Sequence, residues 1–451
     1  QVGDVVLNKA MSRWANTLQL VSFFGRFNYT FDDTYLLTFT LRDDATSRFH
    51  KDSRWGLFPA LALGWKITNM SFMENVRDVM NDAKLRLGWG ITGQQDLGGS
   101  YFPYLPVYTS STSSGFQYVD YNGKWYINPL YPNAYDENIK WEETTTWNAG
   151  IDLAFLNNRF TASIDWYLRN TKDLLAFTPV AGVNTANYMN RNIGSLRNVG
   201  IEATIGAKPV VTKDLTWNTS LNVAWNRNKI TALTGDAETS QISARDVPSG
   251  TGGTLQWHLV GEPAYSYRVY QQVYDNAGNP VEGQYVDQNA DGVIDDKDLI
   301  LYHSPDPKVT FTWNNTVNYK NWDFGISLRA NLGNYVYNNP RYEHVRLDGV
   351  STYMLNNLMR DEYLFKTTDS NLKLSDYFVE NASFIRCDNI TVGYTFPELI
   401  NKSLKLRLFG AVQNPFVITK YKGVDPEVFS GIDNNLYPRP ITCTLGVVAT
   451  F

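Results

Sequence analysis

The chain has 451 residues and a formal net charge of −5 at pH 7, with a pI near 5.5. This acidic balance argues against a nucleic-acid-binding protein, because phosphates require a basic face. Aromatic residues make up 14% of the chain, which favours a β-rich fold. The longest near-continuous apolar run, Trp55 to Trp65, is far below the roughly 18 residues of a membrane-spanning helix. A membrane protein with this sequence would therefore have to be a closed β-sheet.

The start of the chain and its cysteines set two further expectations. The residues after Gln1 do not form a signal peptide, which would have a basic start and then an apolar segment. An exported protein of this kind would therefore have its true N-terminus elsewhere. Two cysteines, Cys387 and Cys443, cannot form a disulfide framework, and we expect both to be free thiols.

Period-two alternation of apolar and polar residues recurs along the whole chain and predicts β-strands. From Phe160, for example, the residues Phe160, Ala162, Ile164, Trp166 and Leu168 alternate with Thr161, Ser163, Asp165, Tyr167 and Arg169. The predicted strands number thirteen: 18–31, 33–43, 54–68, 82–92, 144–156, 159–172, 198–211, 215–231, 308–320, 322–336, 383–396, 402–415 and 440–451.

Short and long connections alternate between these strands. The long ones lie near 44–53, 93–143, 173–197, 232–307, 337–382 and 416–439. A soluble β-sandwich need not sort its connections in this way, and its outward residues should be polar. Here one face is rich in Asn, Thr, Ser, Lys and Arg, as in a water-filled lumen, and the other carries Trp and Tyr near the strand ends, as in a membrane girdle. The prediction is an all-β, transmembrane antiparallel β-barrel.

The last strand closes on Phe451, and a C-terminal aromatic residue resembles the signal by which outer-membrane barrels are recognised for insertion. If Phe451 ends at the periplasm, the short turns are periplasmic and the first strand runs inward. Bacterial single-chain barrels have an even number of strands. An odd set that begins in an outer loop predicts that further strands precede residue 1.

Four segments resemble the C-terminal half of the SusC/RagA family, the TonB-dependent transporters of Bacteroidota. They are residues 141–160 (WEETTTWNAGIDLAFLNNRF), 198–202 (NVGIE), 382–397 (ASFIRCDNITVGYTFP) and 423–428 (GVDPEV). The resemblance extends over nearly the whole of residues 1–451 and implies a barrel of about 22 strands. The chain would then hold the last thirteen, without the N-terminal plug and the first strands.

The resemblance also implies partners and a location. They are a surface lipoprotein of the SusD type that forms a lid, TonB acting through the missing plug, outer-membrane lipid, and an oligosaccharide or oligopeptide ligand. Two such transporter–lipoprotein pairs could associate as a dimer. The implied place is the bacterial outer membrane.

An Asp-rich segment in the longest predicted loop follows the spacing of a Ca²⁺-binding loop. The expected ligands are Asp287, Asn289, Asp291, the carbonyl of Val293, Asp295 and Asp298, with Gly292 at the sharp turn. The twelfth position of this spacing, counted from Asp287, is Asp298, whereas a helix-loop-helix site has Glu there. The shorter side chain predicts weaker binding of Ca²⁺, in a structural role. The alternative is an Asp/Asn-rich turn that holds no ion.

Aromatic residues crowd the predicted loop 93–143. Those with a candidate role in contacting the substrate or the lid are Tyr101, Phe102, Tyr104, Tyr118, Tyr121, Trp125 and Tyr126. Aromatic faces stack on sugar rings and supply contact area to partner proteins. The alternative is that these rings pack the loop against its neighbours.

No catalytic set is evident, because the four histidines are scattered and no phosphate loop or nucleophile elbow occurs. We therefore expect no enzyme. The leading hypothesis is active, TonB-dependent import of an oligomeric nutrient, either glycan or peptide. The alternatives are a surface barrel that binds or scaffolds a partner, and a passive pore.

Overall fold

The computed structural model describes most of the chain. The described residues are 15–97, 101–106, 108–110, 118–119, 121–122, 125–126, 130–132, 134–179, 188–233, 241–247, 253–345, 373–396, 404–434 and 436–450. Phe451, the expected C-terminal signal residue, lies outside them. No helix in these ranges is long and apolar enough to cross a membrane.

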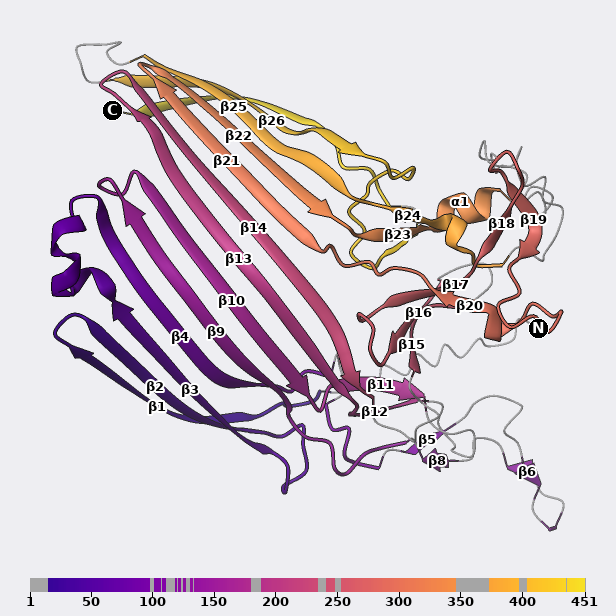
Figure 1. Cartoon of the computed structure of the whole chain (residues 1–451). Coiled ribbons are helices and arrows are strands. Elements are labelled where there is room, and N and C mark those ends of the chain that lie inside the picture. The colour runs from indigo at the N-terminus through magenta and orange to yellow at the C-terminus, as the bar shows by residue number, and fades with distance from the viewer. Residues whose placement is uncertain are drawn as a thin grey trace, which may run out of the picture.

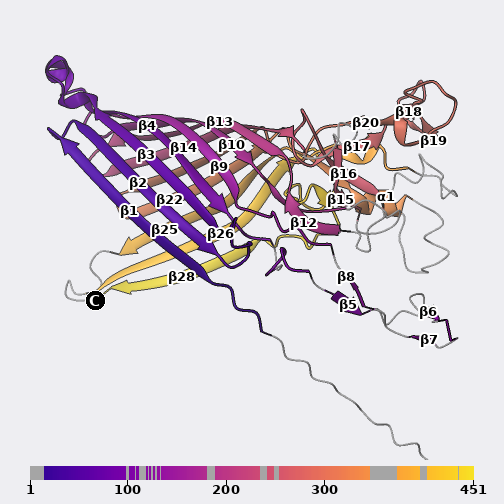
Figure 2. The ribbon, with the colours of Figure 1, turned by 90° about the horizontal axis from the view of Figure 1, so that it is seen from below.

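One antiparallel sheet of thirteen strands dominates the fold, and it confirms the predicted number of strands. Its strands are β1 (Leu20–Phe31), β2 (Tyr35–Thr46), β3 (Trp55–Lys66), β4 (Met80–Gln94), β9 (Glu142–Phe155), β10 (Phe160–Lys172), β13 (Ser195–Val211), β14 (Leu215–Ala232), β21 (Val309–Tyr319), β22 (Trp322–Leu332), β25 (Phe384–Phe396), β26 (Lys405–Thr419) and β28 (Thr442–Thr450). They pair in this order, with β1 and β28 at the edges. The sheet curves into a trough (Figure 2).

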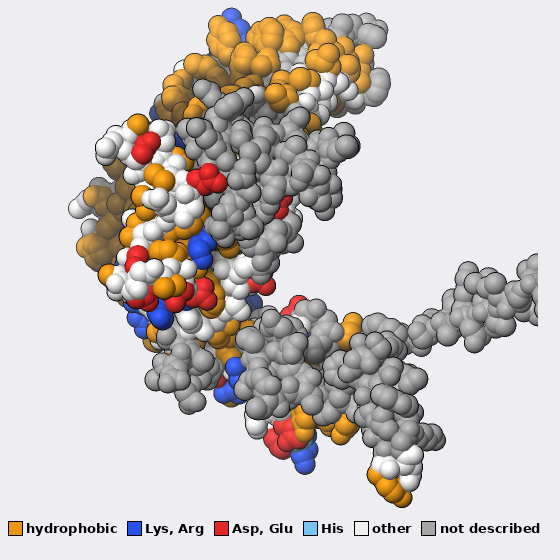
Figure 3. Space-filling model, turned by 90° about the vertical axis from the view of Figure 1, so that its right-hand side faces the viewer, with side chains coloured by type: hydrophobic (Ala, Val, Ile, Leu, Met, Phe, Trp, Pro, Cys, Tyr) orange, Lys and Arg blue, Asp and Glu red, His pale blue; other side chains and the backbone are white. Residues whose placement is uncertain are grey.

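The two faces of the sheet differ as the alternation predicted. Side chains such as Phe27 on β1 and Trp147 on β9 point away from the hollow and are 57% and 51% exposed. Polar pairs cover the other face, for example Thr38 with Asn28, at 2.9 Å, and Thr204 with Asn222, also at 2.9 Å. Seen from the end with the long connections, the molecule forms an arc around an open hollow (Figure 3).

The connections sort by length as expected, and the short ones lie at one end of the strands (Figure 1). The short connections are 32–34, 67–79, 156–159, 212–214 and 320–321, and a further one, 397–404, lies mostly outside the described residues. The connection 67–79 contains two short 3₁₀ helices, η1 (Ile67–Asn69) and η2 (Ser71–Val76). Two residues in left-handed backbone conformation, Asp32 (φ 51°) and Asn157 (φ 57°), let the strands reverse tightly.

The long connections hold secondary structure that the sequence did not predict. Small sheets form from β11 (Leu175–Pro179) with β12 (Tyr188–Asn192), from β15 (Gln241–Asp246), β16 (Thr254–Leu259), β17 (Ser266–Tyr270) and β20 (Leu299–Leu301), and from β18 (Gln272–Tyr274) with β19 (Pro280–Tyr285). Others form from β24 (Val379–Asn381), β23 (Tyr335–Asn338) and β27 (Ile432–Asp433), from β5 (Tyr108–Ser110) with β8 (Leu130–Pro132), and from β6 (Tyr118–Val119) with β7 (Trp125–Tyr126). Three further helices lie in the described parts of these connections: η4 (Asp296–Asp298), α1 (Asn339–His344) and η5 (Asp376–Phe378).

The predicted strand 322–336 was too long. β22 ends at Leu332, Gly333 follows with φ 81°, and β23 then pairs with β24 and β27 instead of with the large sheet. A glycine in left-handed conformation breaks the extended path of the strand. The chain thereby leaves the large sheet and enters the assembly of long connections.

The main hydrophobic core lies within the long connections, because the large sheet faces open space on both sides. Tyr267, Tyr337, Tyr342 and Phe378 are fully buried there. Both cysteines are free, as predicted, with Cys387 buried and Cys443 exposed. The described parts of the long connections are therefore packed against one another at one end of the hollow.

Candidate functional site

A cavity of about 490 Å³ opens where the long connections meet the hollow of the sheet. We call it the mouth pocket. Its lining residues come from several strands and connections: Leu196, Asn228, Arg245, Ala264, Tyr265, Pro305, Asp306, Pro307, Asn331, Asn334, Glu427, Val428, Phe429 and Arg439. A second cavity of about 420 Å³ shares Asn228, Asp306 and Pro307 and extends along β14 past Trp225 and Lys229.

The mouth pocket offers both polar and aromatic contacts. Asn228 and Asn331 lie on β14 and β22, and Asn334 follows β22. Among the described residues, none donates a hydrogen bond to the buried side-chain oxygen of Asn334. Phe429 is 98% exposed, and a ring in water gains free energy when a flat ligand covers it. The pocket suits an uncharged ligand with donors, acceptors and apolar faces.

Charged groups in the pocket are held by neighbours. The guanidinium of Arg245 stacks on the Tyr265 ring at 4.1 Å and donates to the Ser430 carbonyl at 2.7 Å. Burial raises the pKa of the Asp306 carboxyl, and the nearby Arg245 offsets part of this effect. Asp306 is thus more readily protonated than an exposed aspartate.

A group of six charged side chains, which we call the mouth ion network, fixes the connection 420–441 at this pocket. Its members are Arg329, Arg386, Asp388, Asp425, Glu427 and Arg439. Arg386 of β25 meets Asp425 at 2.6 Å, and both side chains are buried. Arg329 of β22 meets Glu427 at 2.6 Å, and Arg439 meets Glu427 at 2.7 Å. Three cations face three anions, so the network adds no net charge to the mouth.

Tyr267 ties the same connection to the small sheets. Its buried hydroxyl lies 2.7 Å from the carbonyl of Gly431 and 2.9 Å from that of Tyr335, and it can donate to either. Burial raises the pKa of Tyr267 well above its usual value, so the hydroxyl keeps its proton. Gly431 has φ 76°, and a Cβ there would stand 2.5 Å from the Tyr267 hydroxyl. Glycine is therefore required at the closest approach.

The candidate aromatic residues of the long connection 95–141 are not gathered in one place. Tyr104 packs beside a buried cluster of Phe49, Phe58, Ile139 and Trp141, with its ring 6.0 Å from that of His50. Tyr101 lies 6.0 Å from the Arg48 guanidinium, and Phe102 is partly buried in the turn that leads to Leu105.

The other candidates occupy a hairpin that projects from the molecule (Figures 1 and 2). Tyr118 pairs with Tyr126, and Val119 with Trp125, in β6 and β7. Tyr121 at its turn is 97% exposed. Among the candidates whose side chains the structure describes, Tyr101, Phe102, Tyr104 and Tyr121, none lines the mouth pocket. Their contact with a substrate or a lid stays a prediction.

The Asp-rich segment folds as a compact turn held by its own backbone. Asp287 accepts from the Gly292 N–H at 2.8 Å, and Asp291 accepts from the Val293 N–H at 2.9 Å. Asn289 donates to Asp291 at 2.9 Å. Gly292 has φ 82°, as the sharp turn requires.

Asp298 and Asp295 close the other end of this turn. Asp298 accepts from the Gln288 and Asp295 N–H groups, each at 2.8 Å, and the Asp295 N–H is the main cause that lowers the pKa of Asp298. Asp295 in turn caps η4. Over the described part of the chain, no three His, Cys, Asp or Glu side chains converge closely enough to hold a metal ion.

Sequence reasoning missed the mouth pocket and the mouth ion network. A signal was present, because Arg386, Asp388, Asp425 and Glu427 lie within the segments 382–397 and 423–428 that carry the family resemblance. Period-two alternation gave no hint of their pairing. The partners Arg386 and Asp425 are 39 residues apart.

Comparisons with known proteins bear directly on this architecture. The family model described as "TonB dependent receptor-like, beta-barrel" matches residues 7–414. The TonB-dependent receptor SusC of Bacteroides thetaiotaomicron is 47% identical over 98% of this chain and 45% of its own length. The TonB-dependent receptor P3 of Formosa agariphila is 28% identical over 98% of this chain and 46% of its own length.

The solved structure of the RagAB peptide transporter has the same fold. It aligns with a TM-score of 0.78 at 23% identity, over 96% of this chain and 48% of that chain. The chain thus spans about half the length of the relatives it matches.

Proposed function

The chain belongs to the TonB-dependent receptor-like β-barrel family, in its SusC/RagA branch in the outer membrane, and we propose that it forms the C-terminal part of an active nutrient importer. The single observation that carries the proposal is the polar hollow of the large sheet with the mouth pocket at its end. A ligand held there would stand at the entrance of the lumen. The relatives are named as receptors, and we propose transport rather than enzymatic catalysis.

The proposed cargo is an oligomeric nutrient, a glycan or a peptide. The neutral mouth ion network, the asparagines and the exposed Phe429 ring suit either class, because both present hydrogen-bonding groups beside apolar faces. RagAB is named a peptide transporter, which supports the peptide alternative by analogy of fold alone.

The proposed partners are a SusD-like surface lipoprotein and TonB. Packed connections with exposed side chains such as Tyr121 and Tyr437 could support a lid over the hollow. TonB would act through a plug encoded with the rest of the protein. Two barrel–lipoprotein pairs could associate as a dimer.

Uptake by cells that express the full-length protein tests import. Labelled oligosaccharides and oligopeptides are each supplied to these cells and to cells that express a variant of the protein without its plug. We expect one class to accumulate only with the intact plug and functional TonB. Uptake that persists without TonB would support a passive pore, and binding without uptake would support a surface scaffold. Co-purification of a lipoprotein after gentle solubilisation tests the lid.

Phe429→Ala tests the mouth pocket. Because Phe429 is 98% exposed, its removal leaves no cavity, and we expect a loss of roughly 0.5–1.5 kcal/mol of ligand affinity, about 2- to 10-fold. The matched control is Tyr437→Ala in the same connection, which is 90% exposed and does not line the pocket. Equal transport KM values for the two variants and the parent protein would remove Phe429 from the binding site.

We also propose that the Asp-rich turn binds Ca²⁺ as a structural ion. One observation favours it: in the part of the chain that the structure describes, no hydrogen-bond donor reaches the buried Asp287 Oδ1. A buried carboxylate oxygen is costly unless it is paired or coordinates a metal. Lys297 lies 3.7 Å from Asp291 and 3.5 Å from Asp295, so an ammonium supplies positive charge beside this turn. Binding would require Lys297 to move and the carboxylates of Asp291, Asp295 and Asp298 to turn toward the ion.

Limited proteolysis with Ca²⁺ and with a chelator tests the ion. We expect chelation to speed cleavage within residues 286–299, and Asp287→Ala together with Asp291→Ala to abolish the difference. Asp275→Ala is the control, since that side chain accepts hydrogen bonds from the Ala277 and Asn279 N–H groups in a separate turn. Cleavage that is insensitive to Ca²⁺ in the parent protein would refute the structural role.

A further inference from the structure

The connection between β3 and β4, residues 67–79, differs from the other short connections. We call it the rim turn. The connections 32–34, 156–159, 212–214 and 320–321 have at most four residues. The rim turn is longer, contains η1 and η2, and projects beyond the strand ends (Figures 1 and 2).

The rim turn exposes large apolar side chains. Phe72 is 63% exposed, Val76 42% and Val79 56%. Nothing in the described part of the molecule covers them. Neighbouring exposed apolar side chains mark a contact surface.

Contacts place the rim turn beside the outward face of the large sheet. The Tyr35 hydroxyl donates to the Met70 sulfur at 3.8 Å. Tyr35 pairs with Trp65 on β3, and its ring lies 6.4 Å from that of Phe31. These three aromatic side chains belong to the apolar, outward set at the short-turn ends of their strands. The apolar surface of the rim turn therefore continues this aromatic rim.

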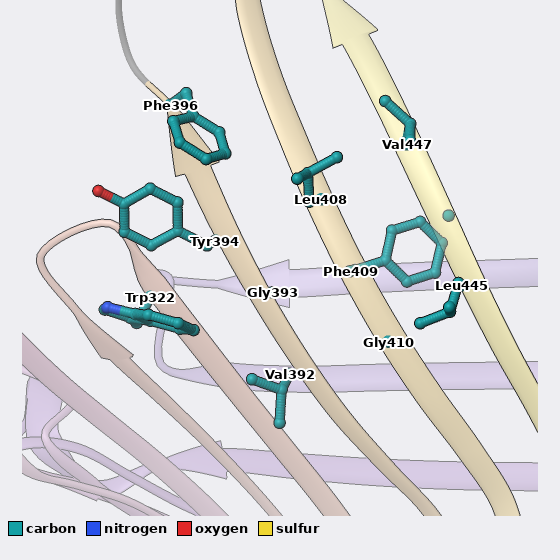
Figure 4. A pocket seen from close by; sticks show the side chains of 11 residues that line it. Trp322, Val392, Gly393, Tyr394, Phe396, Leu408, Phe409, Gly410, Leu445 and Val447 are labelled. Atoms are coloured by element: carbon teal, nitrogen blue, oxygen red, sulfur yellow. The ribbon is translucent and has the colours of Figure 1, made fainter.

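The same outward apolar surface continues around the sheet at this end. Trp322 stands edge-on to Tyr394 at 4.8 Å, and a cavity of about 920 Å³ lies beside them against Leu408, Leu445 and Val447 (Figure 4). Aromatic girdles at both membrane surfaces are characteristic of outer-membrane barrels, and their short turns face the periplasm. This rim thus lies at the periplasmic leaflet.

Two polar side chains of the rim turn bond to backbone carbonyls of this turn and of its neighbour. Arg77 donates to the carbonyl of Thr68 at 2.7 Å and to that of Met70 at 3.3 Å. Asn69 donates to the Asp33 carbonyl at 2.9 Å, which fastens the turn to its neighbour. A backbone carbonyl that already accepts a hydrogen bond can approach lipid acyl chains at a small cost in free energy.

We propose that the rim turn is an interfacial anchor, which inserts Phe72, Val76 and Val79 at the boundary between headgroups and acyl chains of the periplasmic leaflet. Continuity with the lipid-facing rim favours lipid over a periplasmic protein as the occupant. Short amphipathic segments bind membranes in this manner, with their apolar side chains at the acyl boundary and their charged groups in water. Glu74 and Asp78 supply exposed charges within the same turn.

Spin labelling of the full-length protein in phospholipid vesicles tests the anchor. Cys443 is replaced by serine, since it is exposed, whereas buried Cys387 does not react. A nitroxide is then placed by Phe72→Cys, and in a second variant by Val76→Cys. Oxygen partitions into acyl chains and a nickel chelate into water. We expect an oxygen-to-nickel accessibility ratio several-fold higher at both positions than at a solvent control.

Two positions calibrate the measurement. Lys213→Cys, in the polar turn 212–214, is the solvent control, and Leu63→Cys, outward on β3 and 45% exposed, is the lipid control. Ratios at 72 and 76 that match Leu63→Cys support the anchor. Ratios that match Lys213→Cys overturn it, and so does protection from both reagents, which would indicate a bound protein.

Discussion

Arg386→Met is expected to destabilise the mouth of the barrel by about 3 kcal/mol, at the lower end of the range for breaking a buried ion pair. Arg386 is 3% exposed and donates to Asp425 at 2.6 Å and to Asn414 at 2.6 Å. Its removal leaves the buried carboxylate of Asp425 with one cation among the described residues, Arg439 at 3.1 Å, beside the Glu427 N–H at 2.9 Å. The connection 420–441 should then detach more often from β25.

Limited proteolysis of the connection 420–441 and thermal unfolding measure this effect. Lys172→Met is the control, since the Lys172–Glu143 pair joins an exposed lysine to a partly exposed glutamate and contributes less than about 1 kcal/mol. The double variant Arg386→Met, Asp425→Leu should recover part of the loss, because an apolar pair needs no counter-ion. Equal cleavage rates in Arg386→Met and Lys172→Met would contradict a stabilising role for the mouth ion network.

Gly150→Ala is expected to cost roughly 1–3 kcal/mol of barrel stability, as overpacking of a close contact does. Arg86 of β4 and Asp165 of β10 meet directly over this glycine of β9, at 2.9 Å. A Cβ at residue 150 would stand 2.3 Å from Asp165 Oδ1 and 2.8 Å from Arg86 Nη2. The side chains can swing aside, but they then lose their charge-assisted hydrogen bonds.

Gly88→Ala provides the matched control on the neighbouring strand. A Cβ at residue 88 meets only Asn148 Cβ, at 3.7 Å, which is an ordinary contact. We expect a change within about 0.5 kcal/mol for this variant. Heat-modified gel mobility and denaturant unfolding in vesicles compare the two. If both variants unfold at the same denaturant concentration as the parent protein, the contact over Gly150 contributes nothing to stability.

The thirteen strands of the large sheet could be predicted because a barrel strand repeats one local rule along its length. Each side chain faces either lipid or lumen. The polarity of Ile164 and of Asp165 therefore indicates the face on which each lies, and the neighbouring strands need not be known. Even so, the irregular pairing at Ser327 and Leu328 against Cys387 and Asn389 was not predicted, since register shifts depend on both strands.

The long connections followed no such rule. β17 pairs with β16 and β20, and Tyr270 also bridges to Ser375, more than 100 residues away. Three- to six-residue strands of this kind carry too little periodicity to distinguish them from loops. The mouth pocket was missed for the same reason, because Asn228, Asp306 and Phe429 meet only after those connections pack.

Gly150 has two counterparts, and together they bear on the mechanics of the barrel. Tyr167 reaches over Gly200 to Asn226 at 3.1 Å, and Arg407 reaches past Gly393 to Asp323. Each link joins a strand to its next-but-one neighbour. Backbone hydrogen bonds, by contrast, join adjacent strands only, so the angle between two strands can still change. Such braces resist flattening of the cross-section. In the proposed importer, such links on the lumen-facing side of these strands would help to keep the diameter of the barrel constant while the plug moves.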